Sequence, residues 1–118
     1  MLAMFMGVKS VSCRDVLALS STAAVFDVNA PARWAIAHVP GARHLDPHSF
    51  TAIDLPDDRQ SLLVFYCSNP MCSKAPLAAR RAKAMGFTQV RVMSAGIQGW
   101  LDAKFAVESS STAAPVLE

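Results

Sequence analysis

The sequence predicts an α/β fold, in which a mostly parallel sheet carries helices on both faces. Short apolar runs alternate with segments of helical periodicity along the 118 residues, and neither a repeat nor a linker divides them. The run 62–66 (LLVFY) is unbroken, as expected of a central strand buried on both faces. With 53% hydrophobic and only 17% charged residues, the chain has the composition of a single globular domain.

The first half of the chain begins with a capped helix. Ser12 followed by Asp15 is typical of an N-cap with an acid at the third helical position, so we expect a short helix through Leu19. The run 23–28 (AAVFDV) predicts a buried strand. Pro31 then suits the first turn of a second helix, where its missing N–H is not needed.

A turn separates these elements from the central strand and its helix. Residues 39–42 (VPGA) predict the turn, because proline fixes φ and the glycine after it tolerates a positive φ. Beyond 62–66 and its loop we expect a helix with Ser73 as N-cap, Pro76 in its first turn and Gly86 just past its end. Its inner face would consist of small and apolar residues at helical spacing: Ala75, Ala78, Ala79, Ala82 and Met85.

The last elements are a further strand and a short helix. We expect the strand over 89–93 and a helix that starts at Gly96, with Trp100 packing it on the core. The residues after Glu108 are polar and of low complexity. We therefore expect a domain over 1–108 and a flexible C-terminal tail over 109–118.

Composition also limits the partners and the compartment. Three cysteines cannot all pair within one chain, which favours a reducing compartment, so we expect a cytoplasmic protein. No apolar run approaches the ~20 residues of a membrane span, and residues 1–6 lack the features of a secretory signal. A net charge of +2 does not call for nucleic acid, so we expect neither nucleic acid nor membrane as a partner.

Basic residues are concentrated in the second half of the chain. Residues 71–104 contain a single acid, Asp102, against six bases: Lys74, Arg80, Arg81, Lys83, Arg91 and Lys104. Such a surplus favours a small anion nearby. A solvated helix face is the alternative explanation for the bases at 80, 81 and 83.

Cys67 is the candidate nucleophile. It lies at the carboxyl end of the central strand and just before a helix, where ligands collect in open α/β sheets. Inward-facing amides and the helix N-terminus would lower its pKa and favour a thiolate. The alternative is a buried structural cysteine. The expected cradle of amides around the sulfur consists of six residues: Ser68, Asn69, Pro70, Met71, Cys72 and Ser73.

Cys72 adds a second thiol to the same loop. Five residues beyond Cys67, it suits a resolving partner in a reversible disulfide, or else an unpaired residue that fills the loop. The sequence lacks the C-x-x-C partner set typical of zinc sites, so we expect no metal.

Four pieces of the sequence together resemble the rhodanese family of sulfurtransferase domains. They are D-V at 27–28, the segment ending in H-V-P-G-A at 34–42, F-Y-C at 65–67 and S-A-G-I-Q-G-W at 94–100. The resemblance covers about residues 8–107. It implies a single-domain rhodanese-like fold, whose central, mostly parallel sheet has five strands flanked by helices on both faces.

The resemblance also implies an activity that needs no cofactor. The Cys67 thiolate would take a sulfane sulfur from thiosulfate or a persulfide, and would pass it to cyanide, a thiol or an acceptor protein. The loop over 67–72 has the length of the sulfur-handling members, whereas phosphatase-like relatives carry one residue more. Loop length therefore speaks against oxyanion reduction or phosphate hydrolysis, which are weaker alternatives.

The loop departs from the family pattern. Cys72 stands at the arginine position and Pro70 at the usual glycine, so the bidentate clamp for an oxyanion is missing. Lys74 is a possible auxiliary charge, although a flexible one. We expect weak use of thiosulfate and a persulfide donor instead; the other hypothesis is a non-catalytic or redox-sensing module with a Cys67–Cys72 disulfide. Three further departures lie outside the loop: Asn29, Arg33 and Ala37.

Two polar residues near the expected site have structural interpretations. His38 would suit a general base when taken alone, but the resemblance implies a structural histidine near the end of the sheet. Asp27, at a strand end, is expected to be a buried hydrogen-bond acceptor rather than an acid.

Overall fold

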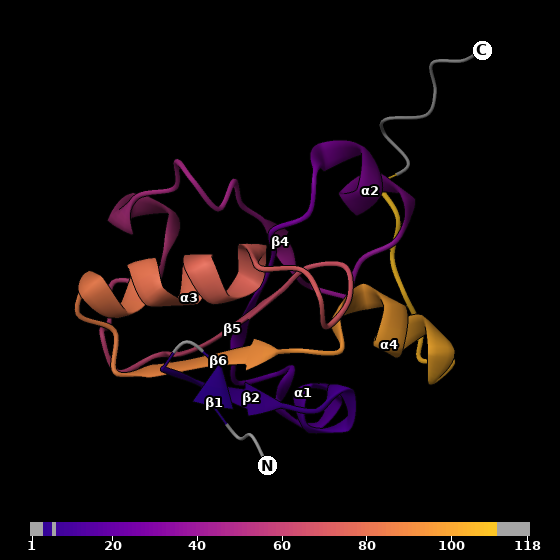
Figure 1. Cartoon of the computed structure of the whole chain (residues 1–118), viewed down its shortest axis with the longest axis horizontal. Helices are drawn as coiled ribbons and strands as arrows, with labels where there is room; N and C mark the ends of the chain where they lie inside the picture. Colours follow the sequence, from indigo (N-terminus) through magenta and orange to yellow (C-terminus); the bar gives the residue numbers. More distant parts are fainter. Residues whose placement is uncertain (1–3, 6, 111–118) are drawn as a thin grey trace.

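The computed structural model describes residues 4–5 and 7–110, and it confirms the α/β fold (Figure 1). One sheet has the strand order β1-β2-β6-β5-β3-β4. Its strands are β1 (Met4–Phe5), β2 (Val8–Val11), β3 (Ala24–Asp27), β4 (Arg43–His44), β5 (Leu62–Tyr66) and β6 (Gln89–Met93). The helices are α1 (Cys13–Leu19), α2 (Pro31–Ile36), the short 3-10 helix η1 (Ala52–Asp54), α3 (Lys74–Ala84) and α4 (Gly96–Asp102).

The expected five parallel strands are present, and one short strand is added to them. Strands β2, β6, β5, β3 and β4 run parallel, whereas the two-residue β1 pairs antiparallel with β2 at the edge. Strand β5 lies between β3 and β6, with Val64 opposite Val25 on one side and Arg91 on the other. The apolar run is therefore the central strand that the sequence predicted.

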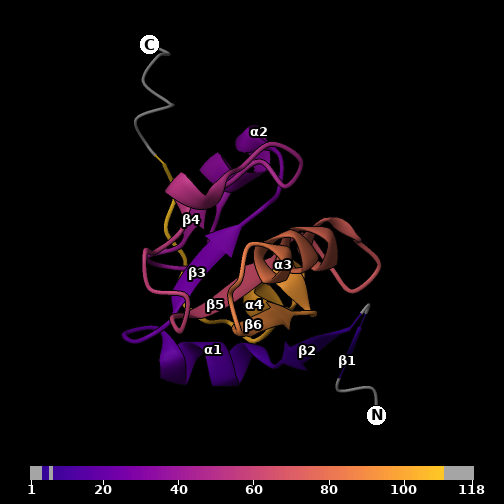
Figure 2. The same cartoon turned by 90° about the vertical axis from the view of Figure 1, so that its left-hand side faces the viewer.

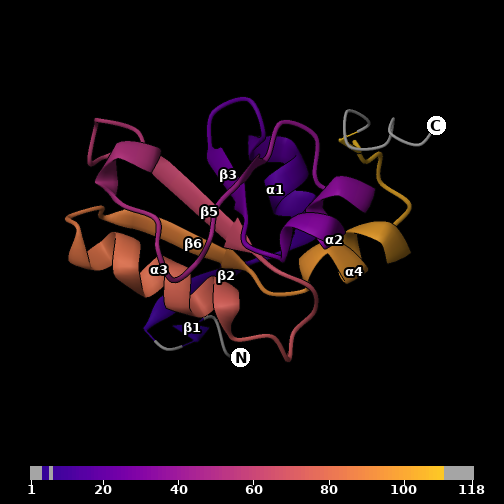
Figure 3. The ribbon, with the colours of Figure 1, turned by 90° about the horizontal axis from the view of Figure 1, so that it is seen from above.

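Side chains of β5 alternate between two apolar cores. Leu63 and Phe65 pack on the side of α3, whose small inner face includes Ala78. Val64 and Tyr66 pack on the other side, with residues of α1 and α4. Figures 2 and 3 show α1 and α3 on opposite sides of the sheet. Because the alternation continues past the strand, Cys67 belongs to the core on the α3 side.

The start of α1 and the end of α3 form as their sequences predict, whereas Ser73 occupies the N-cap position of α3 without a capping bond from its side chain. At the start of α1 the Asp15 N–H donates to Ser12 Oγ (3.0 Å), and the Ser12 N–H donates to Asp15 Oδ2 (3.3 Å). At the end of α3, Gly86 takes a positive φ of 103°. The Phe87 N–H then donates to the Ala82 carbonyl (3.2 Å), which is the bond of a Schellman motif.

The sequence did not predict the positions of the short strands β2 and β4. Strand β2 has the sequence V-K-S-V, in which only the end positions are apolar, and β4 is two residues long. Each is recognised by its pairing with a longer strand, β2 with β6 and β4 with β3. Periodicity is too weak a signal in segments of this length.

The chain after α4 returns to the region of α2. Trp100 Nε1 donates to the Ala106 carbonyl (2.8 Å), and His38 and Glu108 pair through their backbones. Of the expected tail, 111–118 lies outside the described residues, and the Ser110 N–H donates to the Ala35 carbonyl (3.0 Å). Within the described chain no helix has the length and apolar character required to cross a membrane.

Candidate active site

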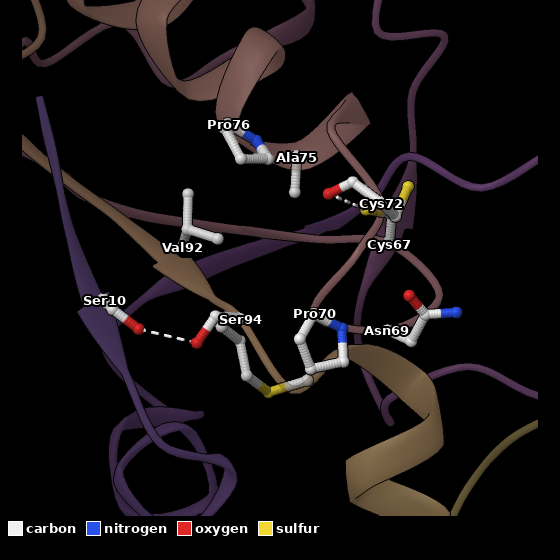
Figure 4. Close-up of a pocket in the computed structure, with 10 residues that line it drawn as sticks. Ser10, Cys67, Asn69, Pro70, Cys72, Ala75, Pro76, Val92 and Ser94 are labelled. Carbon is white, nitrogen blue, oxygen red and sulfur yellow. Dashed lines mark hydrogen bonds between the residues drawn. The ribbon is translucent and has the colours of Figure 1, made fainter. Parts of the chain in front are cut away.

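Cys67 follows the central strand and has little contact with solvent. Its side chain is 3% exposed, and its thiol donates to the carbonyl oxygen of Cys72 at 3.6 Å. The two thiol groups also lie close enough for each to shift the pKa of the other. The structure thus places the two cysteines side by side on one loop (Figure 4).

A turn within the loop brings Cys72 back to Cys67. The Cys72 N–H donates to the Asn69 carbonyl (3.1 Å), and the Met71 N–H donates to Asn69 Oδ1 (2.8 Å). Asparagine in the first position and Pro70 in the second are favourable for such a turn, because Asn bonds its own backbone and Pro fixes φ. The sequence N-P-M-C therefore explains the local geometry.

Because of this turn, the predicted cradle of amides around the sulfur is only partly formed. The N–H groups of Met71 and Cys72 are used within the turn, and Pro70 has no N–H. The prediction that amides of all six residues from Ser68 to Ser73 face the sulfur is therefore wrong for three of them.

Backbone amides from both ends of the loop lower the pKa values of the two thiols. The N–H groups of Ser68 and Ala75 face Cys67, and those of Lys74 and Ser68 face Cys72. Lys74 and Ala75 are the first residues of α3, and the side chain of the N-cap residue, Ser73, makes no capping bond. The two thiol groups thus lie where a capping oxygen would otherwise satisfy the first amides of a helix.

The two thiols differ in acidity, and the lowered pKa is not on the expected residue. Burial, followed by the hydrogen bond with Cys72, raises the pKa of Cys67 to about 12. Burial also raises the pKa of Cys72, but the Cys67 thiol, the Lys74 and Ser68 amides and the Lys74 ammonium together hold that pKa below its usual range. The prediction of a thiolate at Cys67 is corrected: the first negative charge of the pair lies on the less buried Cys72, with the Cys67 S–H donating to it.

Helix α4 holds the start of the loop in place. The N–H groups of Ile97 and Gln98 donate to the carbonyls of Cys67 (2.9 Å) and Ser68 (3.0 Å). Gly96 has a φ of 67°, and a Cβ there would lie 2.6 Å from the Ser68 carbonyl carbon and 2.7 Å from the Asn69 nitrogen. The sequence predicted only that a helix starts at Gly96, and it carried no local signal for this contact with a distant segment.

Asn29 holds the loop from the other side. It is buried, and its Oδ1 accepts a hydrogen bond from Ser68 Oγ (2.6 Å). Its own N–H donates to Asp27 Oδ1 (2.8 Å), and its carbonyl pairs with His44 Nε2 (2.7 Å). The asparagine that replaces an arginine of the family pattern is therefore a positioning residue for the loop.

A small pocket of about 140 Å³ opens beside the two sulfurs (Figure 4). Both cysteines line it together with apolar side chains that include Pro76 and Val92. The hydroxyls of Ser10 and Ser94 form a hydrogen bond (2.7 Å) on its far side. Among the described residues that line it, none carries a cationic side chain, so the pocket suits an uncharged or weakly charged sulfur compound better than a dianion.

Lys74 lies on the opposite side of the loop. It lines a second pocket of about 270 Å³, together with His44, Asp46, His48 and Asn29. The predicted auxiliary cation therefore does not reach into the pocket beside the sulfurs. Its charge acts on Cys72 instead, where it lowers the pKa of the thiol.

Asp27 and His38 lie outside both pockets. Asp27 is fully buried, and burial raises the pKa of its carboxyl group while the Asn29 amide and the Tyr66 hydroxyl oppose that rise. His38 Nδ1 lies 2.7 Å from the Trp34 carbonyl, and its ring stacks on the indole at 3.4 Å between centroids. Both residues thus support the backbone near the sheet end.

The described part of the chain brings no three His, Cys, Asp or Glu side chains together in a group that could hold a metal ion. The chemistry that these residues can perform is therefore that of two neighbouring thiols on a loop held by α4, Asn29 and the start of α3.

Comparison with known proteins gives the family. Residues 12–103 match the rhodanese-like domain family. The chain belongs to the rhodanese family. Two similar proteins are named thiosulfate sulfurtransferase GlpE: that of Ectopseudomonas mendocina is 31% identical over 69% of this chain and 72% of its own length, and that of Pseudomonas fluorescens strain Pf0-1 is 35% identical over 66% and 70%.

A solved structure supports the same fold. The BH2092 protein from Bacillus halodurans superposes with a TM-score of 0.78 at 21% sequence identity, covering 86% of this chain and 77% of that protein. Rhodanese-like architecture is therefore shown by sequence and by structure, and the fold class predicted from the sequence is confirmed.

Proposed function

We propose that this rhodanese-like domain is a sulfurtransferase that carries sulfane sulfur as a persulfide on Cys67. The observation that carries the proposal is the position of this cysteine, at the carboxyl end of β5, with the Ser68 and Ala75 amides on its sulfur. Those amides favour a negative charge on the sulfur in the transition state. The names of the GlpE relatives support the same reaction class. We assign the domain to residues 1–108.

The pair of thiols provides a route to the reactive thiolate. Cys72 ionises first, and its thiolate accepts the hydrogen bond from the Cys67 thiol. Transfer of that proton to Cys72 leaves the thiolate on Cys67. Cys67 then attacks the outer sulfur of a persulfide donor, the bond between the donor's two sulfurs breaks, and the donor leaves as a thiolate. The acceptor, which is cyanide, a thiol or a protein thiol, attacks the outer sulfur of the enzyme persulfide and takes it away.

The pocket favours persulfides over thiosulfate as donors. Thiosulfate carries two negative charges, and the residues described around the pocket supply no cation for them. An organic persulfide brings an apolar chain and a smaller charge, which match a pocket lined by Pro70, Pro76 and Val92. We expect a kcat/KM for thiosulfate that is lower than that for a small organic persulfide by about tenfold or more.

Cyanolysis tests the proposal. Protein mixed with a sulfur donor, freed rapidly of excess donor and treated at once with cyanide, before the added sulfur is lost, releases thiocyanate in proportion to Cys67. Cys67→Ser releases none, while Cys13→Ser, a change in the core on the other face of the sheet, leaves the yield unchanged. Equal thiocyanate from the wild type and Cys67→Ser would refute the proposal. Intact mass in the first moments after mixing gives a second readout, a gain of one sulfur atom that maps to Cys67.

The contact between the two thiols also favours a second candidate function, redox sensing by a Cys67–Cys72 disulfide without sulfur transfer. Mild oxidation of the reduced protein, together with treatment by a persulfide donor, distinguishes redox sensing from sulfur transfer. A loss of two hydrogens on the peptide with both cysteines, without any sulfur gain from a persulfide donor, supports the redox module alone.

A further inference from the structure

We propose that Cys72 resolves the Cys67 persulfide, so that the domain releases hydrogen sulfide and is left with a Cys67–Cys72 disulfide. This inference rests on the proposed persulfide of Cys67 and adds a persulfide-reducing activity to it. It follows from three features of the loop: the distance between the two residues, the charge on Cys72 and the space beside them.

The first feature is contact. The Cys67 thiol donates to the Cys72 carbonyl at 3.6 Å, and the turn closed by Asn69 holds Cys72 against it. When Cys67 carries an extra sulfur, its own Sγ remains bonded to Cβ and remains next to Cys72. The inner sulfur of the persulfide, which is the atom that a resolving thiol attacks, therefore lies against the residue that carries its attacker (Figure 4).

The second feature is the nature of Cys72 as a nucleophile. Its side chain is less buried than that of Cys67, and the amides of Ser68 and Lys74 and the Lys74 ammonium surround its sulfur. These groups favour a thiolate, which is the attacking form. An arginine, which the family pattern has at this position, carries no sulfur and offers no such step.

The third feature is room for the leaving sulfur. The pocket of about 140 Å³ is lined by both cysteines, so a sulfur added to Cys67 has space beside the pair. Ser94, which borders this pocket, is exposed, so hydrosulfide has a route to solvent.

The atoms and electrons balance as follows. The Cys72 thiolate attacks Cys67 Sγ and forms the new S–S bond, while the bond from Cys67 Sγ to the sulfane sulfur breaks. Its electron pair leaves on the sulfane sulfur, which keeps its proton and departs as hydrosulfide. The sulfane sulfur is reduced and the two cysteine sulfurs are oxidised. An external dithiol, or two molecules of a small thiol, then reduces the disulfide for the next cycle.

A single-turnover experiment tests the inference. Fully reduced protein is mixed without oxygen with one equivalent of glutathione persulfide, and both free sulfide and intact mass are followed. Wild type is expected to gain one sulfur transiently, then to release one sulfide and end two hydrogens lighter. Cys72→Ser is expected to load at alkaline pH and to keep the added sulfur, with its sulfide release slower by about 100-fold or more. Cys13→Ser serves as the matched control and behaves as wild type.

The outcomes separate the two proposals. A wild-type persulfide that lasts as long as that of Cys72→Ser overturns the resolving role and leaves the sulfurtransferase proposal intact. If neither protein gains a sulfur that maps to Cys67, the sulfurtransferase proposal fails. Release of sulfide by Cys67→Ser at the wild-type rate would show that the sulfur never passes through Cys67, and would overturn both.

Discussion

The two halves of the active-site loop are held in different ways. Residues 67–69 are fixed by the rest of the fold: α4 donates to two of their carbonyls, Gly96 packs against their backbone, and Asn29 accepts from the Ser68 hydroxyl. Residues 70–73 depend on a local turn, and Met71 at its tip is 90% exposed. The sulfur of Cys67 is therefore placed by tertiary structure, whereas that of Cys72 is placed by the sequence of the turn.

This difference suits the division of work that we propose. A sulfur carrier needs a fixed position between the central strand and α3, because its amide donors are part of the backbone. A resolving thiol has to approach a longer group when Cys67 is loaded, and a locally held turn permits such a movement. The following changes test this contrast, beginning with the largest expected effect.

We expect the largest loss of stability from a substitution at Gly96, because this residue packs against the backbone of the loop. In Gly96→Ala the new Cβ meets the backbone of Ser68 and Asn69 at 2.6–2.7 Å and also sits at a positive φ. We expect the free energy of unfolding to fall by about 2–5 kcal/mol, from backbone strain and overpacking, and the sulfur loading of Cys67 to slow. Urea unfolding and intact-mass loading measure the two effects.

Gly41→Ala is the matched control for this change. Gly41 has a φ of 80°, but a Cβ there meets nothing within 4 Å. In Gly41→Ala the free energy of unfolding should therefore fall only by the cost of placing alanine at a positive φ, about 1–2 kcal/mol. The sulfur loading of Cys67 should be unchanged. An equal loss of stability in both variants would show that the contact with the loop contributes nothing.

Asp27 gives the next effect, since it supports Asn29 and through it the first half of the loop. Burial raises the pKa of its carboxyl group above the ordinary 3.8, so the folded protein binds its proton more tightly than the unfolded chain. The free energy of unfolding should therefore fall as pH rises from about 3.8 to the raised pKa, and level off above it. In Asp27→Asn this slope is absent. Unfolding in urea at several pH values measures it, and identical slopes in both proteins would contradict the assignment.

The sequence predicts where Cys67 lies, but not the contact that holds the start of the loop. The central strand, the helix after it and the position of Cys67 between them follow from apolar runs and helix-end residues. The contact of Gly96 with Ser68 joins segments that are distant in the chain, and no local pattern encodes it. This contact is seen only in the folded structure.

The acidity of the two thiols was predicted for the wrong residue for a related reason. The sequence shows a cysteine before a helix, but not how deeply it is buried nor which amides a turn has already used. Three amides are missing from the cradle, because Pro70 has no N–H and the side chain and backbone carbonyl of Asn69 accept those of Met71 and Cys72. The apolar core around Phe65 raises the pKa of Cys67. Burial is a property of the whole fold, so it was not available from the motif.

The hydrogen bond between the thiols gives a smaller, pH-dependent effect. The Cys67 thiol is one of the groups that lower the pKa of Cys72, so Cys67→Ala should raise it. The rate of Cys72 alkylation by iodoacetamide would then reach half its maximum at a higher pH than in the wild type. Lys74→Met should also move the half-maximal rate of Cys72 alkylation to a higher pH, but by a smaller amount than Cys67→Ala. A shift to lower pH in Cys67→Ala would show that the Cys67 thiol does not stabilise the Cys72 thiolate.

The smallest effect on stability is expected from the turn itself. Asn69→Ala removes the oxygen that accepts the Met71 N–H, in an exposed part of the loop. We expect the free energy of unfolding to change by at most about 1 kcal/mol, because water replaces the lost bond. The rate at which the Cys67–Cys72 disulfide forms under mild oxidant should nevertheless fall, since the turn that holds the second thiol against the first keeps only its backbone bond. Ser73→Ala, whose side chain makes no capping bond, is the matched control and should keep the wild-type rate. If Asn69→Ala instead forms the disulfide as fast as the control, then the approach of Cys72 to Cys67 is set by the start of α3 and not by the turn.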